Sequence, residues 1–121
     1  MKYVHTTILI SNLEASVKFY EQQAGLTVQR RFPAGPGKEI AFLADQAGDT
    51  CVELMQSAAD GVFKGTGISL GFRVADLDKE RAAKEAAGLN PGPVISPNPH
   101  TRFFYISDPD GVRIQFTEEK K

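Results

Sequence analysis

The segment Phe103–Phe116, which reads FFYISDPDGVRIQF, predicts a β-hairpin with its turn at Asp108-Pro109-Asp110-Gly111. Proline restrains φ at the second turn position, and glycine suits the last position, where a positive φ is needed. Because side chains alternate along a strand, the strand after the turn should have one apolar and one polar face. The apolar face would hold Val112, Ile114 and Phe116, and the polar face would hold Arg113, Gln115 and Thr117. The polar row is a candidate lining for a cavity.

The pattern of this hairpin occurs a second time, earlier in the chain. Cys51-Val52-Glu53-Leu54 aligns with Arg113-Ile114-Gln115-Phe116, and His5–Phe19 aligns with Ser69–Ala83. Such internal similarity indicates two copies of one structural unit. We therefore expect a single domain over residues 1–121, with module one in 1–56, a linker in 57–66 and module two in 67–121.

Composition narrows the class of partner. The chain has 121 residues, 41% of them hydrophobic and 24% charged, which is typical of one globular domain. No apolar run approaches the roughly 20 residues of a membrane span, and a net charge of −1 offers no basic surface for nucleic acid. The start of the chain lacks the pattern of a secretory signal, and the single cysteine, Cys51, cannot form an internal disulfide. We expect a cytoplasmic protein with a small-molecule ligand, and neither nucleic acid nor a membrane as partner.

Module one begins with alternating residues and continues with a helical pattern. Tyr3–Ile10 is predicted to be a strand in which His5 faces away from the aliphatic row. Ser11 is expected to cap the following helix, with Glu14 completing a capping box, and Gly25 is expected to end it. Module two repeats this order.

In module two, Asp76 is the expected helix cap, and Leu77, Ala82 and Ala86 form the expected apolar stripe. Four prolines restrict residues 90–100 to an edge strand or an extended loop. Since each helix follows the first strand of its module, both helices should cover the same face of the sheets. The predicted fold class is α+β: two tandem βαβββ modules with antiparallel-rich mixed sheets that form a cupped cavity, and helices on the outer face.

The face opposite the helices carries polar residues at matching positions of the two modules: His5 and Glu53 in the first, Ser69 and Gln115 in the second. An imidazole and a carboxylate on adjacent strands suit a divalent metal ion, and Gln115 offers a neutral amide oxygen. Ser69 is a poor ligand. His5 is thus either a metal ligand or a strand histidine bonded to the backbone.

The repeat and these residues resemble the vicinal oxygen chelate superfamily, which includes glyoxalase I, bleomycin resistance proteins and extradiol dioxygenases. The matching motifs are HTTILISNLEASVKFYEQQAGL at 5–26, VEL at 52–54, FRVADLD at 72–78 and SDPDGVRIQF at 107–116. The resemblance implies metal ligands at His5, Glu53, Ser69 and Gln115, whereas histidine is usual at the third position and glutamate at the fourth. It therefore implies a weakly bound Zn, Ni, Mn or Fe ion with His5, Glu53 and Gln115 as ligands, or no metal. It also implies a homodimer.

Further polar residues are candidates for substrate binding, together with Ser69. Arg73 and Arg113 either bind a substrate carboxylate or phosphate, or are solvated or paired with acids. His100 and Tyr105 either reach the cavity rim or have surface roles. Glu53 would be costly to bury without a partner, which favours a functional role.

Two functions are compatible with this pattern. The first is a glyoxalase-like lyase or isomerase in which Glu53 is catalytic and accepts a proton from carbon next to a carbonyl. The second is a non-catalytic, bleomycin-resistance-type protein that holds a small molecule between apolar walls and the two arginines. Turnover of a hemithioacetal of glutathione or a related thiol separates them.

Overall fold

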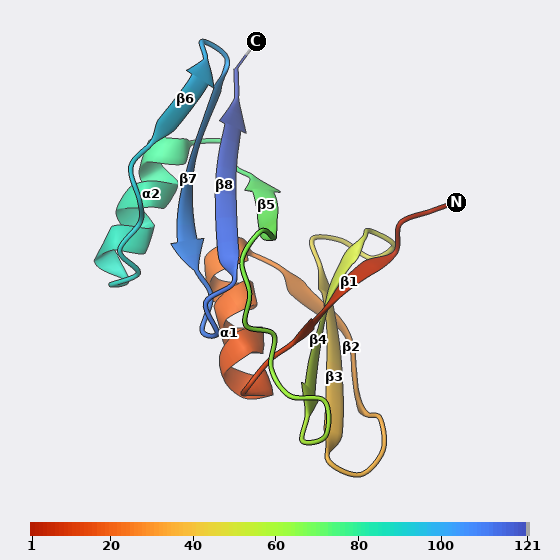
Figure 1. Cartoon of the computed structure of the whole chain (residues 1–121). Helices are drawn as coiled ribbons and strands as arrows, with labels where there is room; N and C mark the ends of the chain where they lie inside the picture. The colour runs from red at the N-terminus through yellow and green to blue at the C-terminus, as the bar shows by residue number, and fades with distance from the viewer. Residues whose placement is uncertain (121) are drawn as a thin grey trace. The chain divides into compact units, whose positions relative to one another are not determined.

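The computed structural model describes residues 1–120, which form two compact units, Met1–Lys64 and a second that begins at Gly65. Each unit contains one helix and a four-stranded sheet (Figure 1). The α+β fold of tandem βαβββ modules, predicted from the repeat, is confirmed.

Unit 1 has its first strand paired with its last. Its elements are β1 (His5–Leu9), α1 (Leu13–Ala24), β2 (Thr27–Pro33), β3 (Lys38–Ala44) and β4 (Cys51–Ser57). The strand order is β1-β4-β3-β2, with β1 parallel to β4 and the other pairs antiparallel. Because α1 lies against β3 and β4, one face of this sheet is covered within the unit.

Unit 2 repeats this topology. Its elements are β5 (Ser69–Arg73), α2 (Leu77–Ala86), β6 (Ile95–Asn98), β7 (Thr101–Ser107) and β8 (Arg113–Glu119). The order is β5-β8-β7-β6, with β5 parallel to β8. The proline-rich segment supplies β6 at the edge of the sheet, as expected, since proline cannot donate to a central ladder.

The turn between β7 and β8 forms as its sequence predicts. Oδ1 of Asp108 accepts hydrogen bonds from the backbone N–H groups of Asp110 and Val112, each at 2.9 Å. The N–H of Gly111 donates to the carbonyl of Asp108 at 3.0 Å, and Gly111 has a φ of 91°. These bonds set the register in which Phe104 lies opposite Phe116.

The predicted cap of the first helix is wrong by one residue. Asn12, not Ser11, is the N-cap: its extended backbone lets its side chain accept the N–H of Ala15 at 3.0 Å. At the other end, Gly25 caps the helix with a φ of 67°, as predicted.

The predicted apolar stripe of α2 is right at Leu77, which is fully buried, and wrong at Ala82 and Ala86, which are both exposed. The inward face instead includes Lys84, whose Nζ lies 4.6 Å from the ring centroid of Phe116 and 3.1 Å from Glu80. Short alanine side chains at these positions point away from the sheet, whereas the long lysine stem can cover it and still place its charge beside a partner.

Glu118 continues the buried row of β8 beyond Phe116, although it is charged. Its carboxylate accepts the N–H of Leu77 at 2.8 Å and contacts Arg102 at 3.0 Å. The hydrogen bond from Leu77, followed by that from Arg102, lowers the pKa of Glu118 below its ordinary value. The carboxylate thus joins the start of α2 to the sheet.

Glu118→Gln should reduce stability in a pH-dependent way. Because the folded-state pKa is lowered, the carboxylate stabilises the fold above the ordinary glutamate range, and this stabilisation is lost as the pH falls below about 5. We expect the variant to have a lower Tm than the wild type near neutral pH, and this Tm difference to shrink in acid, as the pH falls below 4.5, the ordinary pKa of glutamate. Glu21→Gln, at an exposed position of α1, is the control. An equal Tm difference at neutral and at acid pH would contradict the role of the charge.

Candidate functional site

A buried carboxylate lies on the face of the unit 1 sheet that is opposite α1. Glu53 on β4 is 7% exposed and is paired with Thr7 of β1 and Phe42 of β3 in the strand registers. One of its oxygens, Oε1, accepts a hydrogen bond from the hydroxyl of Thr7 and lies 3.5 Å from Nε2 of His5. Glu53 is therefore held by two polar partners from the adjacent parallel strand.

Sequence reasoning placed Glu53 and His5 together but did not assign a role to Thr7. The available signal was strand alternation, because Thr7 follows His5 by two residues and must share its face. Its hydroxyl contact provides the partner that a buried carboxylate requires. Oε1 is thereby occupied by Thr7.

Aromatic residues form a wall beside this carboxylate. The ring of Phe42 makes an edge contact with His5 at a centroid distance of 5.5 Å and stacks with Phe32 at 6.2 Å. The guanidinium of Arg30 lies 4.4 Å from the centroid of the Phe42 ring. Sequence analysis assigned no function to Arg30 or to the two phenylalanines.

A cavity of about 520 Å³ opens along this wall. His5, Arg30, Phe42 and Cys51 are among its lining residues. The cavity therefore brings an imidazole, a guanidinium and an aromatic ring to one surface, and the imidazole, that of His5, contacts Glu53. This combination is typical of a small-molecule site: apolar walls with a few convergent polar groups.

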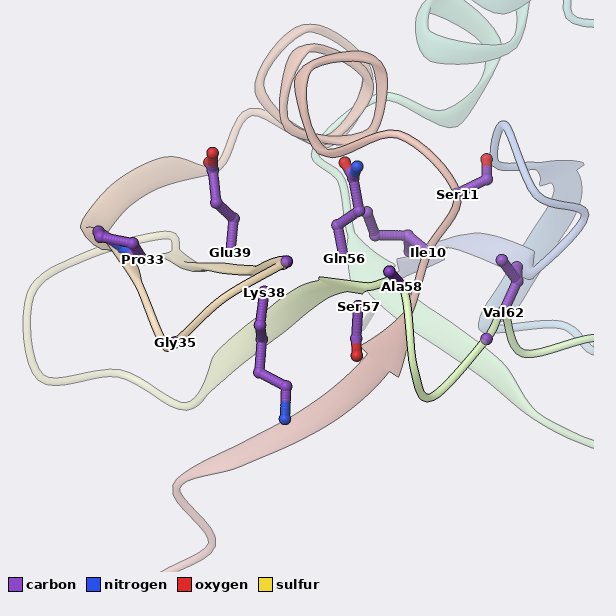
Figure 2. A pocket seen from close by; sticks show the side chains of 12 residues that line it. Ile10, Ser11, Pro33, Gly35, Lys38, Glu39, Gln56, Ser57, Ala58 and Val62 are labelled. Atoms are coloured by element: carbon purple, nitrogen blue, oxygen red, sulfur yellow. The ribbon is translucent and has the colours of Figure 1, made fainter.

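A larger cavity, about 640 Å³, lies between the β2–β3 turn and the segment after β4 (Figure 2). In Figure 2, Lys38 and Ser57 project to one side of the strands, and Glu39 and Gln56 to the other. Lys38 is paired with Asp60 at 3.3 Å, and Oε1 of Gln56 accepts the N–H of Leu13 at the start of α1. Because these polar groups hold the local fold, we take the cavity beside His5 as the candidate site.

Unit 2 gathers three of the predicted binding residues on the corresponding face. Nε2 of Gln115 donates to the hydroxyl of Tyr105 at 3.1 Å, and the guanidinium of Arg113 lies 3.9 Å from the centroid of the Tyr105 ring. Ser69 pairs with Arg113 in the register of β5 and β8. These residues form one polar cluster within unit 2.

The remaining predicted residues of unit 2 have other contacts. Arg73 pairs with Glu119 at 3.2 Å. Pairing with an acid was one of the two alternatives considered for Arg73. His100 lies in the turn between β6 and β7, where its N–H donates to the side chain of Asn98 at 2.8 Å. Substrate binding by Ser69, Arg73, His100, Tyr105 and Arg113 stays a prediction.

The predicted metal ligands are distributed over both units. His5 and Glu53 supply two donors from unit 1, whereas Gln115 belongs to unit 2. Across residues 1–120, no three His, Cys, Asp or Glu side chains are grouped so that they could hold an ion. Two donors fall short of the three or four protein ligands of ordinary zinc sites. The side chains of unit 1 alone therefore do not fit a resident metal.

The model of the glyoxalase/bleomycin resistance protein/dioxygenase superfamily matches residues 2–116. The chain belongs to this superfamily. It is 30% identical to the lactoylglutathione lyase of Haemophilus influenzae over 129 aligned residues, covering 99% of this chain and 94% of that protein. It is also 30% identical over 118 residues to the uncharacterized protein YwbC of Bacillus subtilis, covering 93% of each. The resemblance inferred from the motifs is confirmed.

Solved structures share the fold of this chain. The trypanothione-dependent glyoxalase I of Leishmania major has a TM-score of 0.80 and 21% identity, covering 98% of this chain and 87% of that one. TnmS3, an antibiotic binding protein from a Streptomyces species, has a TM-score of 0.74 and 22% identity, covering 99% and 98%. Within the described residues, no helix is long and apolar enough to cross a membrane. The homodimer and the cytoplasmic location stay predictions.

Proposed function

We propose that this superfamily member is a glyoxalase-like isomerase or lyase that acts on a small hemithioacetal, with Glu53 as the proton acceptor. The observation that carries the proposal is the buried carboxylate of Glu53, held by Thr7 and adjacent to His5. The relatives named lactoylglutathione lyase, which align along nearly the whole chain, support the same class of reaction.

The reaction requires one group that accepts a proton from carbon and returns it to the next carbon. The carboxylate of Glu53 removes the proton from the carbon that bears sulfur and hydroxyl, and the electron pair moves onto the adjacent carbonyl to give an enediolate. The proton returns to that second carbon, and the hydroxyl proton of the first carbon passes to the oxygen of the second, which gives the thioester of a hydroxy acid. Hydrogen moves within one molecule, so neither an oxidant nor a reductant is consumed.

The neighbours of Glu53 have distinct roles in this scheme. The hydroxyl of Thr7 holds Oε1, which leaves Oε2 as the oxygen to accept the proton. His5 lies beside the carboxylate and lines the cavity, where its ring N–H can donate to the oxygen that gains charge. No step is assigned to a metal ion, since His5 and Glu53 supply only two ligands.

The proposal is tested with protein purified without a histidine tag. Methylglyoxal is mixed with glutathione, N-acetylcysteine or 2-mercaptoethanol, and thioester formation is followed with and without added Zn²⁺ or Ni²⁺. We expect enzyme-dependent thioester formation from at least one of the three hemithioacetals. Absence of turnover with all three, in protein shown to be folded, would contradict the enzymatic function.

A second candidate function is sequestration of an aromatic or amphipathic compound. It is favoured by the stacked Phe32 and Phe42 rings and by the cavity of about 520 Å³ that Phe42 lines. In that case, binding of an aromatic acid would be measurable by calorimetry while no hemithioacetal is converted.

A further inference from the structure

The two adjacent arginines of β2 have opposite environments. Arg31 faces the α1 side, where it pairs with Glu14 and lies 3.5 Å from Glu39. Arg30 forms no ion pair with any residue that the structure describes; its guanidinium lies over the rings of Phe42 and Phe32, at 4.4 and 5.6 Å from their centroids. Among the described residues, the guanidinium of Arg30 thus has no carboxylate partner on the face of the sheet that carries Glu53.

A β-bulge places Arg30 on this face. Val28 is paired with Leu43, but Arg30, two residues later, is paired with Phe42, so that Gln29 is the extra residue. In a regular ladder, Gln29 would lie opposite Phe42, and Arg30 would point toward α1. Bulges re-aim side chains and occur frequently next to active sites.

The environment of Arg30 is suited to an anion. Its cavity is also lined by Lys2, His5 and Asp49, so positive groups outnumber the carboxylate even with His5 neutral. Stacking on Phe42 holds the plane of the guanidinium and leaves its N–H edges available, and two such N–H groups match the two oxygens of a carboxylate. Phe42 also contacts His5, at a centroid distance of 5.5 Å, and is paired with Glu53 in the register of β3 and β4.

We propose that Arg30 binds a carboxylate on the thiol part of the substrate, so that the site selects hemithioacetals of carboxylate-bearing thiols. The inference rests on the proposed function. Arg30, Phe42 and Glu53 lie on the neighbouring strands β2, β3 and β4, and Phe42 is paired with both of the others, so one aromatic ring separates the anion-binding group from the proton acceptor on one surface of unit 1. Arg30 is thereby a residue for specificity, and the proton transfer itself stays with Glu53.

The test uses two thiols that differ only in charge, N-acetylcysteine and N-acetylcysteine amide, each as the hemithioacetal of methylglyoxal. We expect the wild type to prefer the acid by about 10-fold or more in kcat/KM, as a charge-assisted hydrogen-bonded pair implies. In Arg30→Gln, KM for the acid should rise until the preference disappears, while kcat and the kinetics of the amide stay close to wild type. Equal losses for both thiols, or no preference in the wild type, would overturn the proposal.

Arg31→Gln is the matched control, because it removes the same charge from the neighbouring residue on the opposite face. It should keep the preference for the acid. A loss of preference in Arg31→Gln equal to that in Arg30→Gln would mean that net charge, not Arg30, decides.

A binding measurement separates this proposal from the proposed reaction. The Nε–H signal of Arg30 is followed by NMR during titration with S-methyl-N-acetylcysteine or with its amide, neither of which can react. A shift with the acid alone supports the carboxylate site even if no hemithioacetal is turned over, in which case only the proposed reaction fails. No shift with the acid overturns the site.

Discussion

Glu53→Gln is expected to lower kcat/KM for the converted hemithioacetal by about 10²- to 10⁴-fold, the usual contribution of a positioned general base. An amide has nearly the size of the carboxylate and can still accept the hydrogen bond from Thr7, but it cannot take a proton from carbon. The fold should therefore persist while the reaction is lost. Steady-state rates of thioester formation, together with a thermal unfolding curve of each protein, measure the two effects separately.

Glu39→Gln is the matched control for this variant. Glu39 is an exposed glutamate on β3 of the same sheet, and it lies on the face of Arg31, away from Glu53. Its replacement should leave the rate unchanged. Turnover by Glu53→Gln that remains within a few-fold of the wild type would show that another group accepts the proton.

Phe116→Ala is expected to reduce the free energy of unfolding by about 3–5 kcal/mol, the usual cost of truncating a buried phenylalanine. Phe116 is 1% exposed, and its ring lies 5.4 Å from that of Phe104 and 6.2 Å from that of Phe72. The truncation also removes the ring beneath the buried ammonium of Lys84. Urea unfolding followed by far-UV circular dichroism measures the loss, and Phe116→Leu should lose less because it leaves a smaller void.

The exposed apolar residue Val94 provides the control, since Val94→Ala should change stability by no more than about 0.5 kcal/mol. A loss of under about 1 kcal/mol in Phe116→Ala would mean that unit 2 closes around the missing ring. It would also mean that Phe116 does not hold β5, β7 and α2 together.

Local sequence rules were sufficient for much of the site. Alternation along β1 and β4 put His5 and Glu53 on one face, and the parallel pairing of those strands brings their side chains to 3.5 Å. The turn at Asp108 was equally readable, because Asp108 and Gly111 bond within the turn itself. Each of these predictions depended only on residues close together in the chain, or on residues at matching positions of the two repeated modules.

Strand alternation does not predict the direction of a side chain where pairing with another strand introduces a bulge. The bulge at Gln29 is a property of the β2–β3 pairing, and no pattern within β2 shows that Arg30 will lie opposite Phe42. The inward face of α2 was likewise decided by what it packs against, since the ring of Phe116 and the carboxylate of Glu80 make a buried Lys84 acceptable. Helical periodicity assigns apolar residues to the inward face, and it therefore placed Ala82 and Ala86 there instead of Lys84.

By itself, the sequence determined the fold, the repeated modules and the pairing of an imidazole with a carboxylate on one face, because repeats and alternation are written in the order of residues. Only the tertiary structure decided which arginine lies on the same face as His5 and Glu53. Arg73, for which anion binding and pairing with an acid were both considered, is paired with Glu119, and Arg31 is paired with acids on the helix side. Arg30 is left over an aromatic ring. The sequence shows where each arginine lies in the chain. Whether a carboxylate neutralises it depends on residues that folding brings from elsewhere in the chain.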